Sequence, residues 1–205
     1  CWLPSAGGNW RFSATALRTR AEDREGSIWV GTEEGCFRYD VGRFEMATRA
    51  DGLASDVVRA LLVTADGRVW AGTAAGLCRR EHGRWRIFTK ADGLAASDVQ
   101  CLWEDRDGTL WIGTTGGLSR YAAGRFSAYT RENGLPDNQV RAIGRAPDGP
   151  LWVATHGGLG RLDSGGFTSY RVQDGLPYST LGSLAVAADG AVWVGSEAGL
   201  SRYAA

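Results

Sequence analysis

Residues 99–138 read VQCLWEDRDGTLWIGTTGGLSRYAAGRFSAYTRENGLPDN, and this stretch determines the fold because close copies of it recur along the chain. Its most recognisable part is a tryptophan followed by x-Gly-Thr or a near variant. The copies of this motif are 41 residues apart and begin at Trp29, Trp70, Trp111, Trp152 and Trp193. A second motif, Asp-Gly-Leu or Asn-Gly-Leu, keeps the same interval from Asp51 to Asp174. The chain is therefore a tandem repeat without insertions between these motifs.

Each copy has the hydrophobic pattern of four strands. In the quoted copy, Asp107-Gly108 lies between two apolar runs, which is a strong signal for a β-hairpin. We expect strands at residues 99–105, 109–114, 118–122 and 125–131. Residues 132–137 contain Gly and Pro, which interrupt a strand ladder, so this segment is expected to link one sheet to the next.

A repeat of about 40 residues with four strands is typical of one blade of a β-propeller. The sequence thus predicts an all-β propeller domain over residues 1–205, with about five four-stranded blades and a large Trp packed between neighbouring blades. The expected blades span residues 15–56, 57–97, 98–138, 139–179 and 180–205. The fifth copy stops after its third strand. Two arrangements stay open: a closed five-bladed ring, with residues 1–14 completing the last blade, or an excerpt of a larger propeller.

Composition argues against several classes of partner. The 23 basic and 23 acidic residues cancel and are scattered along the chain, so a basic surface for nucleic acid is not expected. No apolar run approaches the length of a membrane-spanning helix, and direct membrane insertion is not expected either.

The reactive side chains show no pattern of a catalytic or metal centre. Four cysteines lack CxxC spacing and are interpreted as small core residues. His82 and His156 are the two histidines, and the repeat places them in turns at opposite ends of the blades. The Asp-Gly pairs are explained by hairpin turns and lack the other ligands of a calcium loop. We therefore expect no cofactor, no metal and no catalytic residue.

The combined pattern resembles the two-component regulator propeller repeat. The resemblance is carried by W-x-G-T, G-L-x-R-Y and D-G-L-P, and it extends over the chain from about Leu17 onward. It implies the extracytoplasmic sensor region of a bacterial hybrid histidine kinase or a related signalling protein, in which propellers precede a membrane span. It also implies an oligosaccharide as the ligand and no catalysis. The chain differs from the full pattern because it has about five repeats and no kinase or DNA-binding segment.

Three sets of repeat positions are candidates for ligand binding at one end of a central channel. The first residue of the turn after the second strand varies in polarity, and the links between blades and the start of each first strand carry further polar side chains. The predicted binding residues are Glu33, Thr115, His156, Glu197, Asn138, Tyr178, Arg18, Arg59 and Arg141. For the arginines, two readings stay open: a cationic throat that binds a carboxylate or phosphate, or ion pairs between blades.

The function expected from these features is ligand sensing without catalysis, with a small polar ligand such as an oligosaccharide. Downstream signalling domains in a longer parent chain are the expected partners. The resemblance implies that the propeller itself is in the periplasm or elsewhere outside the cytoplasm. The alternatives are a propeller lyase or glycosidase-like enzyme, and a protein-binding scaffold without a small ligand.

Overall fold

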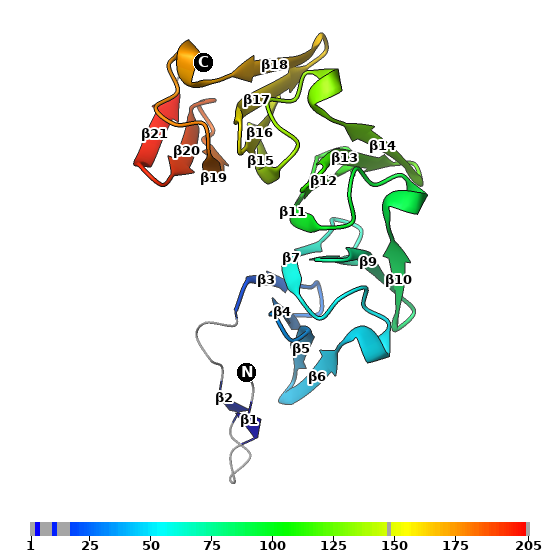
Figure 1. The fold of residues 1–205 in the computed structure, drawn as a ribbon. Helices are drawn as coiled ribbons and strands as arrows, with labels where there is room; N and C mark the ends of the chain where they lie inside the picture. The colour runs from blue at the N-terminus through cyan, green and yellow to red at the C-terminus, as the bar shows by residue number, and fades with distance from the viewer. Residues whose placement is uncertain (1–2, 5–9, 12–16, 147–148, 204–205) are drawn as a thin grey trace. The chain divides into compact units, whose positions relative to one another are not determined.

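The computed structural model describes residues 3–4, 10–11, 17–146 and 149–203. The chain forms two compact units, residues 1–88 and residues 89–205, and each is described by itself. The strands follow one another along the chain in antiparallel sheets, which we call blades 1 to 5 (Figure 1). The predicted all-β fold is confirmed.

The first unit contains blades 1 and 2. Blade 1 consists of β3 (Thr19–Glu22), β4 (Ile28–Gly31), β5 (Cys36–Asp40) and β6 (Arg43–Ala47). Blade 2 consists of β7 (Val58–Val63), β8 (Val69–Thr73), β9 (Gly76–Glu81) and β10 (Arg84–Phe88). The short strands β1 (Leu3–Pro4) and β2 (Trp10–Arg11) pair with each other. Residues 1–14 are the stretch expected to complete the fifth blade. Apart from these two strands, they lie outside the described residues, so that completion stays a prediction.

The second unit contains blades 3, 4 and 5. Blade 3 consists of β11 (Val99–Glu104), β12 (Leu110–Thr114), β13 (Gly117–Ala122) and β14 (Arg125–Tyr129). Blade 4 consists of β15 (Val140–Arg145), β16 (Leu151–Thr155), β17 (Gly158–Asp163) and β18 (Gly166–Tyr170). Blade 5 has three strands, β19 (Leu181–Val186), β20 (Val192–Ser196) and β21 (Gly199–Tyr203).

The links between blades differ from the expected irregular segments. Each contains a short 3₁₀ turn: η1 (Arg49–Asp51), η2 (Lys90–Asp92), η3 (Arg131–Asn133) and η4 (Val172–Asp174). In η1 the Thr48 hydroxyl accepts a hydrogen bond from the Ala50 amide, and the Asp51 carboxylate accepts one from the Thr48 amide. The fourth strand of blade 3 therefore ends at Tyr129, two residues earlier than predicted, because Thr130 caps η3.

Within each unit, the hydrophobic core lies between the faces of successive blades. In the first unit Trp29 of blade 1 packs in one cluster with Val58, Leu61 and Val69 of blade 2. In the second unit Trp111 of blade 3 packs with Val140 and other residues of blade 4, and Trp152 of blade 4 packs with Leu181 and other residues of blade 5. The tryptophans therefore stabilise contacts between blades, as the sequence predicted.

Cys36 and Cys78 belong to the core cluster of the first unit. Burial disfavours the charged thiolate and raises the pKa of Cys36 to about 12 and that of Cys78 to about 11. These thiols are protonated and unreactive at neutral pH. They serve as small apolar side chains.

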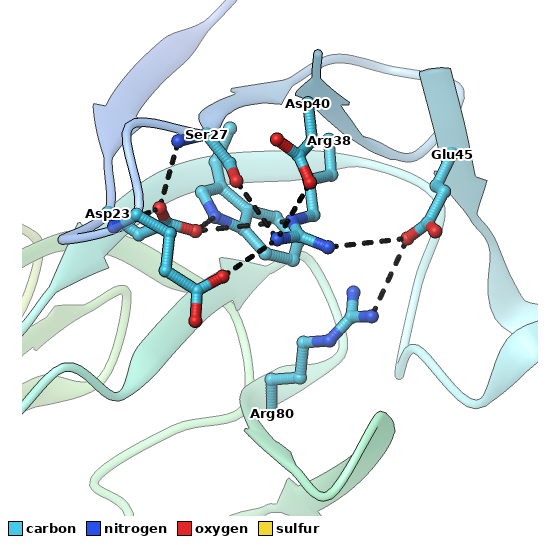
Figure 2. Close-up of polar contacts among 8 residues, drawn as sticks. Asp23, Ser27, Arg38, Asp40, Glu45 and Arg80 are labelled. Carbon is cyan, nitrogen blue, oxygen red and sulfur yellow. Dashed lines mark hydrogen bonds and ion pairs between the residues drawn. The ribbon is translucent and has the colours of Figure 1, made fainter. Parts of the chain in front are cut away.

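A network of charged groups surrounds Trp29 in the first unit (Figure 2). The Trp29 indole N–H donates to Asp23 Oδ2 over 2.8 Å, and the Arg38 and Arg80 guanidiniums lie 5.7 and 4.9 Å from the centre of the Trp29 ring. Four carboxylates lie within 4.0 Å of Arg38, and Glu45 is also 3.7 Å from Arg80. These carboxylates belong to Asp23, Glu25, Asp40 and Glu45. The positive charges of Arg38 and Arg80 are thus balanced by carboxylates of the protein itself.

Gly117 is required by the backbone at the start of β13. Its φ is +144°, and a Cβ there would lie 2.5 Å from the carbonyl oxygen of Tyr129. Gly117→Ala is therefore expected to lower the free energy of unfolding by about 2 kcal/mol, from backbone strain and the steric clash. Chemical denaturation followed by circular dichroism measures this loss.

Gly124→Ala is the matched control. Gly124 also has a positive φ, +79°, but no atom lies within 4 Å of the position of an added Cβ. This variant is expected to lose about 1 kcal/mol from the left-handed backbone alone. Equal losses in the two variants would show that the Tyr129 carbonyl does not restrict Gly117.

Candidate ligand-binding site

A β-bulge at the start of the first strand turns one residue of a blade out of the ladder. In blade 4, Val140 faces Thr155 and Ala142 faces Ala154, so Arg141 is the extra residue between them. The same shift occurs in three other blades, where Arg59, Gln100 and Gly182 are the extra residues. A bulge can redirect a side chain from the regular alternation of its strand. The bulge position holds residues of different chemistry in different blades.

The bulge residue lies beside the first residue of the turn that follows the second strand of the same blade. In blade 4, Arg141 Nε donates to His156 Nε2 over 2.8 Å, and Arg141 Nη1 donates to Gln100 Oε1 of blade 3 over 3.0 Å. In the first unit, Arg18 precedes β3 and forms an ion pair with Glu33. Two of the predicted sets therefore combine into cross-strand pairs that are 15 residues apart in the sequence.

A pocket of about 430 Å³ lies next to the Arg141–His156 pair in the second unit. Its lining joins blade 4 to the first and second strands of blade 5 and to the link before them. The lining residues are Arg141, His156, Thr180, Leu181, Gly182, Ser183, Gly195, Ser196 and Glu197. The volume falls within the usual range for small-molecule sites, about 300–1,000 Å³.

The pocket combines positive, negative and neutral hydrogen-bonding groups. His156 Nε2 accepts a hydrogen bond from the Arg141 guanidinium. Arg141 supplies further N–H donors, Glu197 supplies acceptors, and Ser183 and Ser196 supply hydroxyls. Such a set is suited to a ligand with several hydroxyl or carboxylate groups.

In blade 1 the equivalent residues, Arg18 and Glu33, form an ion pair with each other. The hydrogen bond from Arg18, together with the charges of Arg18 and Arg59, holds the pKa of the exposed Glu33 carboxyl below its usual value. Arg18, Arg59 and Glu33 thus form a charged group in the first unit. Their role toward a ligand stays a prediction.

Three other predicted residues do not belong to the pocket lining as far as the described residues show. The Asn138 side-chain oxygen accepts a hydrogen bond from the Arg131 amide over 2.9 Å, so it supports the start of η3. Asp56 does the same for the Arg49 amide in the first unit. Thr115 is exposed, and Tyr178 is half exposed on the link that leads to Thr180.

Sequence reasoning missed the hydroxyl groups of Thr180, Ser183 and Ser196. A signal for Ser196 was present, because it replaces the buried Thr of the other four W-x-G-T copies. No group of three metal-ligating side chains occurs among the residues that the structure describes. Within the same residues, no helix is long and apolar enough to cross a lipid bilayer.

A family model described as the two-component regulator propeller matches residues 52–75, 93–116 and 134–157. Three of the chain's repeats are thus similar to the two-component regulator propeller repeat. The third matched repeat contains both Arg141 and His156, so this pair lies within a unit that the family defines. The comparison with curated proteins gives no match.

Solved structures with the same fold include sensor domains and enzymes. The extracellular domain of a proposed hybrid two-component system from B. thetaiotaomicron is 21% identical, with a TM-score of 0.81 over 99% of this chain and 33% of that one. Virginiamycin B lyase from Staphylococcus aureus is 18% identical, with a TM-score of 0.69 over 93% of this chain and 70% of that one. These similarities confirm the propeller fold. The chain spans about a third of the sensor domain's length.

Proposed function

We propose that this chain is a ligand-sensing region of a bacterial two-component signalling protein and that it binds a small polar ligand, such as an oligosaccharide, without transforming it. The observation that carries the proposal is the pocket of blades 4 and 5, where Arg141, His156 and Glu197 come together. The matched propeller repeats support the signalling context. The fold shared with an extracellular sensor domain supports a location outside the cytoplasm.

The chemistry of the pocket favours recognition of a polyol. Arginine and carboxylate side chains can each bind two neighbouring oxygen atoms or hydroxyl groups of a sugar, and serine hydroxyls add single hydrogen bonds. Tyr178, which is 50% exposed on the adjoining link, supplies an aromatic face of the kind that packs against a sugar ring. The ligand is therefore expected to be held by polar contacts on one side and an aromatic ring on the other.

The same geometry favours binding over catalysis. A general base needs a free lone pair within reach of the proton that it removes. The lone pair of His156 Nε2 is already used by Arg141. A lyase or glycosidase-like enzyme remains the alternative, and the test below distinguishes it by its products.

The experiment is a calorimetric titration of the protein with a panel of neutral and acidic oligosaccharides. His156→Ala combined with Glu197→Ala is expected to weaken binding of the best ligand by at least about tenfold. The melting temperature should hardly change, because His156 and Glu197 lie outside the core clusters of this unit. Glu132→Ala, an exposed acid in η3, is the control and should bind as the wild type does.

Three results would contradict the proposal. Equal affinity in the double variant would remove the pocket from the site. Shortened or unsaturated sugar products would favour an enzyme. Absence of binding across the panel would favour a scaffold that binds another protein.

A further inference from the structure

We propose that the groove between blades 3 and 4 is a second binding site, which takes an oxyanion carried by a small molecule. Its lining includes Pro150, next to the first hairpin of blade 4, and Ser164, in the last hairpin of that blade. In an antiparallel blade, these hairpins lie at the end opposite to the turn that carries His156. The groove is therefore separate from the pocket proposed for the sensed ligand.

Three arginines from two blades line this groove. Arg120 lies on β13, Arg145 on β15 and Arg161 on β17, and the space between them is about 730 Å³. Trp111, Tyr129 and Asp163 belong to the same lining. The groove is thus large enough for a small organic acid, and half of its lining residues are cationic or aromatic.

The carboxylates near these three arginines do not accept hydrogen bonds from all of the N–H groups that line the groove. Arg145 forms an ion pair with the buried carboxylate of Asp105, and Arg161 Nε lies 3.6 Å from Asp163. Arg120 has no carboxylate within ion-pair distance among the described residues. In that part of the chain, Nε of Arg145, Nε of Arg161 and the indole nitrogen of Trp111 are also buried without an acceptor.

Trp111 is only 4% exposed, so its unused N–H is unusual. Buried polar groups nearly always have a hydrogen-bond partner, and exceptions call for an explanation. Trp29, at the same repeat position, donates to Asp23. Asp105 stands where blade 1 has Asp23, but it is engaged by Arg145 from the next blade.

The groove between blades 1 and 2 provides an internal reference (Figure 2). There, Asp40 and Glu45 lie within 4.0 Å of Arg38. The residues 82 positions later, on β13 and β14 of blade 3, are Ala122 and Ser127, and Ser127 is the register partner of Arg120. The same offset replaces the neutral Val63 with Arg145. Arg145 is gained, but Arg80 of the first groove is replaced by Leu162. The second groove therefore has the same number of these cations and two fewer acids to pair with them.

An oxyanion can take the place of these acids because guanidinium groups bind planar or tetrahedral anions through paired N–H donors. Carboxylate, sulfate and phosphate share this chemistry. The amide and hydroxyl of Thr109 and the charges of Arg120 and Arg145 lower the pKa of Asp107, but its hydrogen bonds come from Thr109 in the hairpin, which leaves the N–H donors of the arginines for a ligand. The groove is therefore expected to bind a small acid at its arginines, next to the ring of Tyr129.

The test uses sodium sulfate, sodium phosphate and glucuronate as three separate probes at constant ionic strength. Binding is followed by tryptophan fluorescence, since Trp111 lines the groove, and by calorimetry. Arg120→Gln should weaken binding of the preferred probe by about tenfold or more. The preferred probe distinguishes a carboxylate ligand from a sulfate or phosphate ligand.

Ser127→Glu is the second variant. It introduces a carboxylate opposite Arg120, as Glu45 lies opposite Arg38 in blade 1. Ser127 is exposed, so the substitution should not disturb folding. It is expected to abolish binding of the added anion and to raise the melting temperature measured without anion. Arg125→Gln, an exposed arginine of β14, is the control and should bind as the wild type does.

These variants distinguish the absence of an anion site in the groove from the absence of a ligand site at Arg141. Arg120→Gln should leave binding at the Arg141 pocket unchanged, and the double variant of that pocket should leave anion binding unchanged. The proposal is overturned if none of the three probes binds. It is also overturned if Arg120→Gln, Ser127→Glu and Arg125→Gln all bind a probe as tightly as the wild type.

Discussion

Trp152→Ala is expected to lower the free energy of unfolding by about 3–5 kcal/mol, the usual loss when a large buried aromatic side chain is truncated in a core. Trp152 is 1% exposed. Its ring centre lies 5.9 Å from that of Tyr170 in its own blade and 5.7 Å from that of Tyr203 in blade 5. Removal of the indole therefore weakens the contact between two blades as well as the sheet itself. Chemical denaturation followed by far-ultraviolet circular dichroism measures the loss.

The repeat supplies a matched control for this variant. Trp193 holds the same position in blade 5 but is 36% exposed, so Trp193→Ala is expected to cost about 1 kcal/mol. The same residue type is thus removed from the same strand position in two environments. If both variants lost equal stability, packing between blades would not be the source of the effect.

Asp23→Ala is expected to lower the free energy of unfolding by about 2–4 kcal/mol, because it leaves partly buried donors without their acceptor. The side chain of Asp23 is 12% exposed. It accepts hydrogen bonds from the Trp29 indole and from the amides of Ser27 and Glu25, and it faces Arg38. The same denaturation assay measures this loss.

Glu25→Ala is the control for the Asp23 variant. Glu25 also pairs with Arg38, at 3.2 Å, but its side chain is 79% exposed. Exposed ion pairs contribute at most about 1 kcal/mol, so this variant should remain close to the wild type. A loss as large as that of Asp23→Ala would show that charge, and not the buried hydrogen bonds, stabilises the network.

The contribution of Asp23 should also depend on pH. Burial by itself would raise the pKa of this carboxyl, but the hydrogen bonds from Trp29, Ser27 and Glu25 and the charge of Arg38 outweigh it and hold the pKa below 3.8. The stabilisation is therefore present above pH about 4 and is lost as the pH falls through the lower pKa of the folded state. The stability difference between wild type and Asp23→Ala should shrink over that range.

The four strands of each blade were predictable because their signals are local. Asp107-Gly108 marks a hairpin, and Trp111 marks a strand buried on both faces. The 3₁₀ turns were missed, although Thr48 and Asp51 carry the spacing of a capping box. The predicted fourth strand, residues 125–131, includes Thr130, the equivalent of Thr48, so the cap at the end of that strand was overlooked.

The binding sites were less predictable because they depend on relations between strands. Arg141 and His156 were both singled out, but their direct contact follows from a bulge that the sequence pattern does not show. The groove of blades 3 and 4 was missed because its arginines are far apart in the chain. Arg145 replaces Val63 of blade 2 in the repeat, and a comparison of charges between copies would have revealed it.

The bulge at the start of the first strand separates the residues that fold a blade from those of the proposed ligand site. Arg141 lies outside the ladder, and His156 begins a turn, so neither side chain supports the core. Natural selection can therefore alter these two codons in a duplicated repeat without loss of the scaffold. A gene built from such copies can acquire new specificities one blade at a time, while the tryptophans and glycines stay constant.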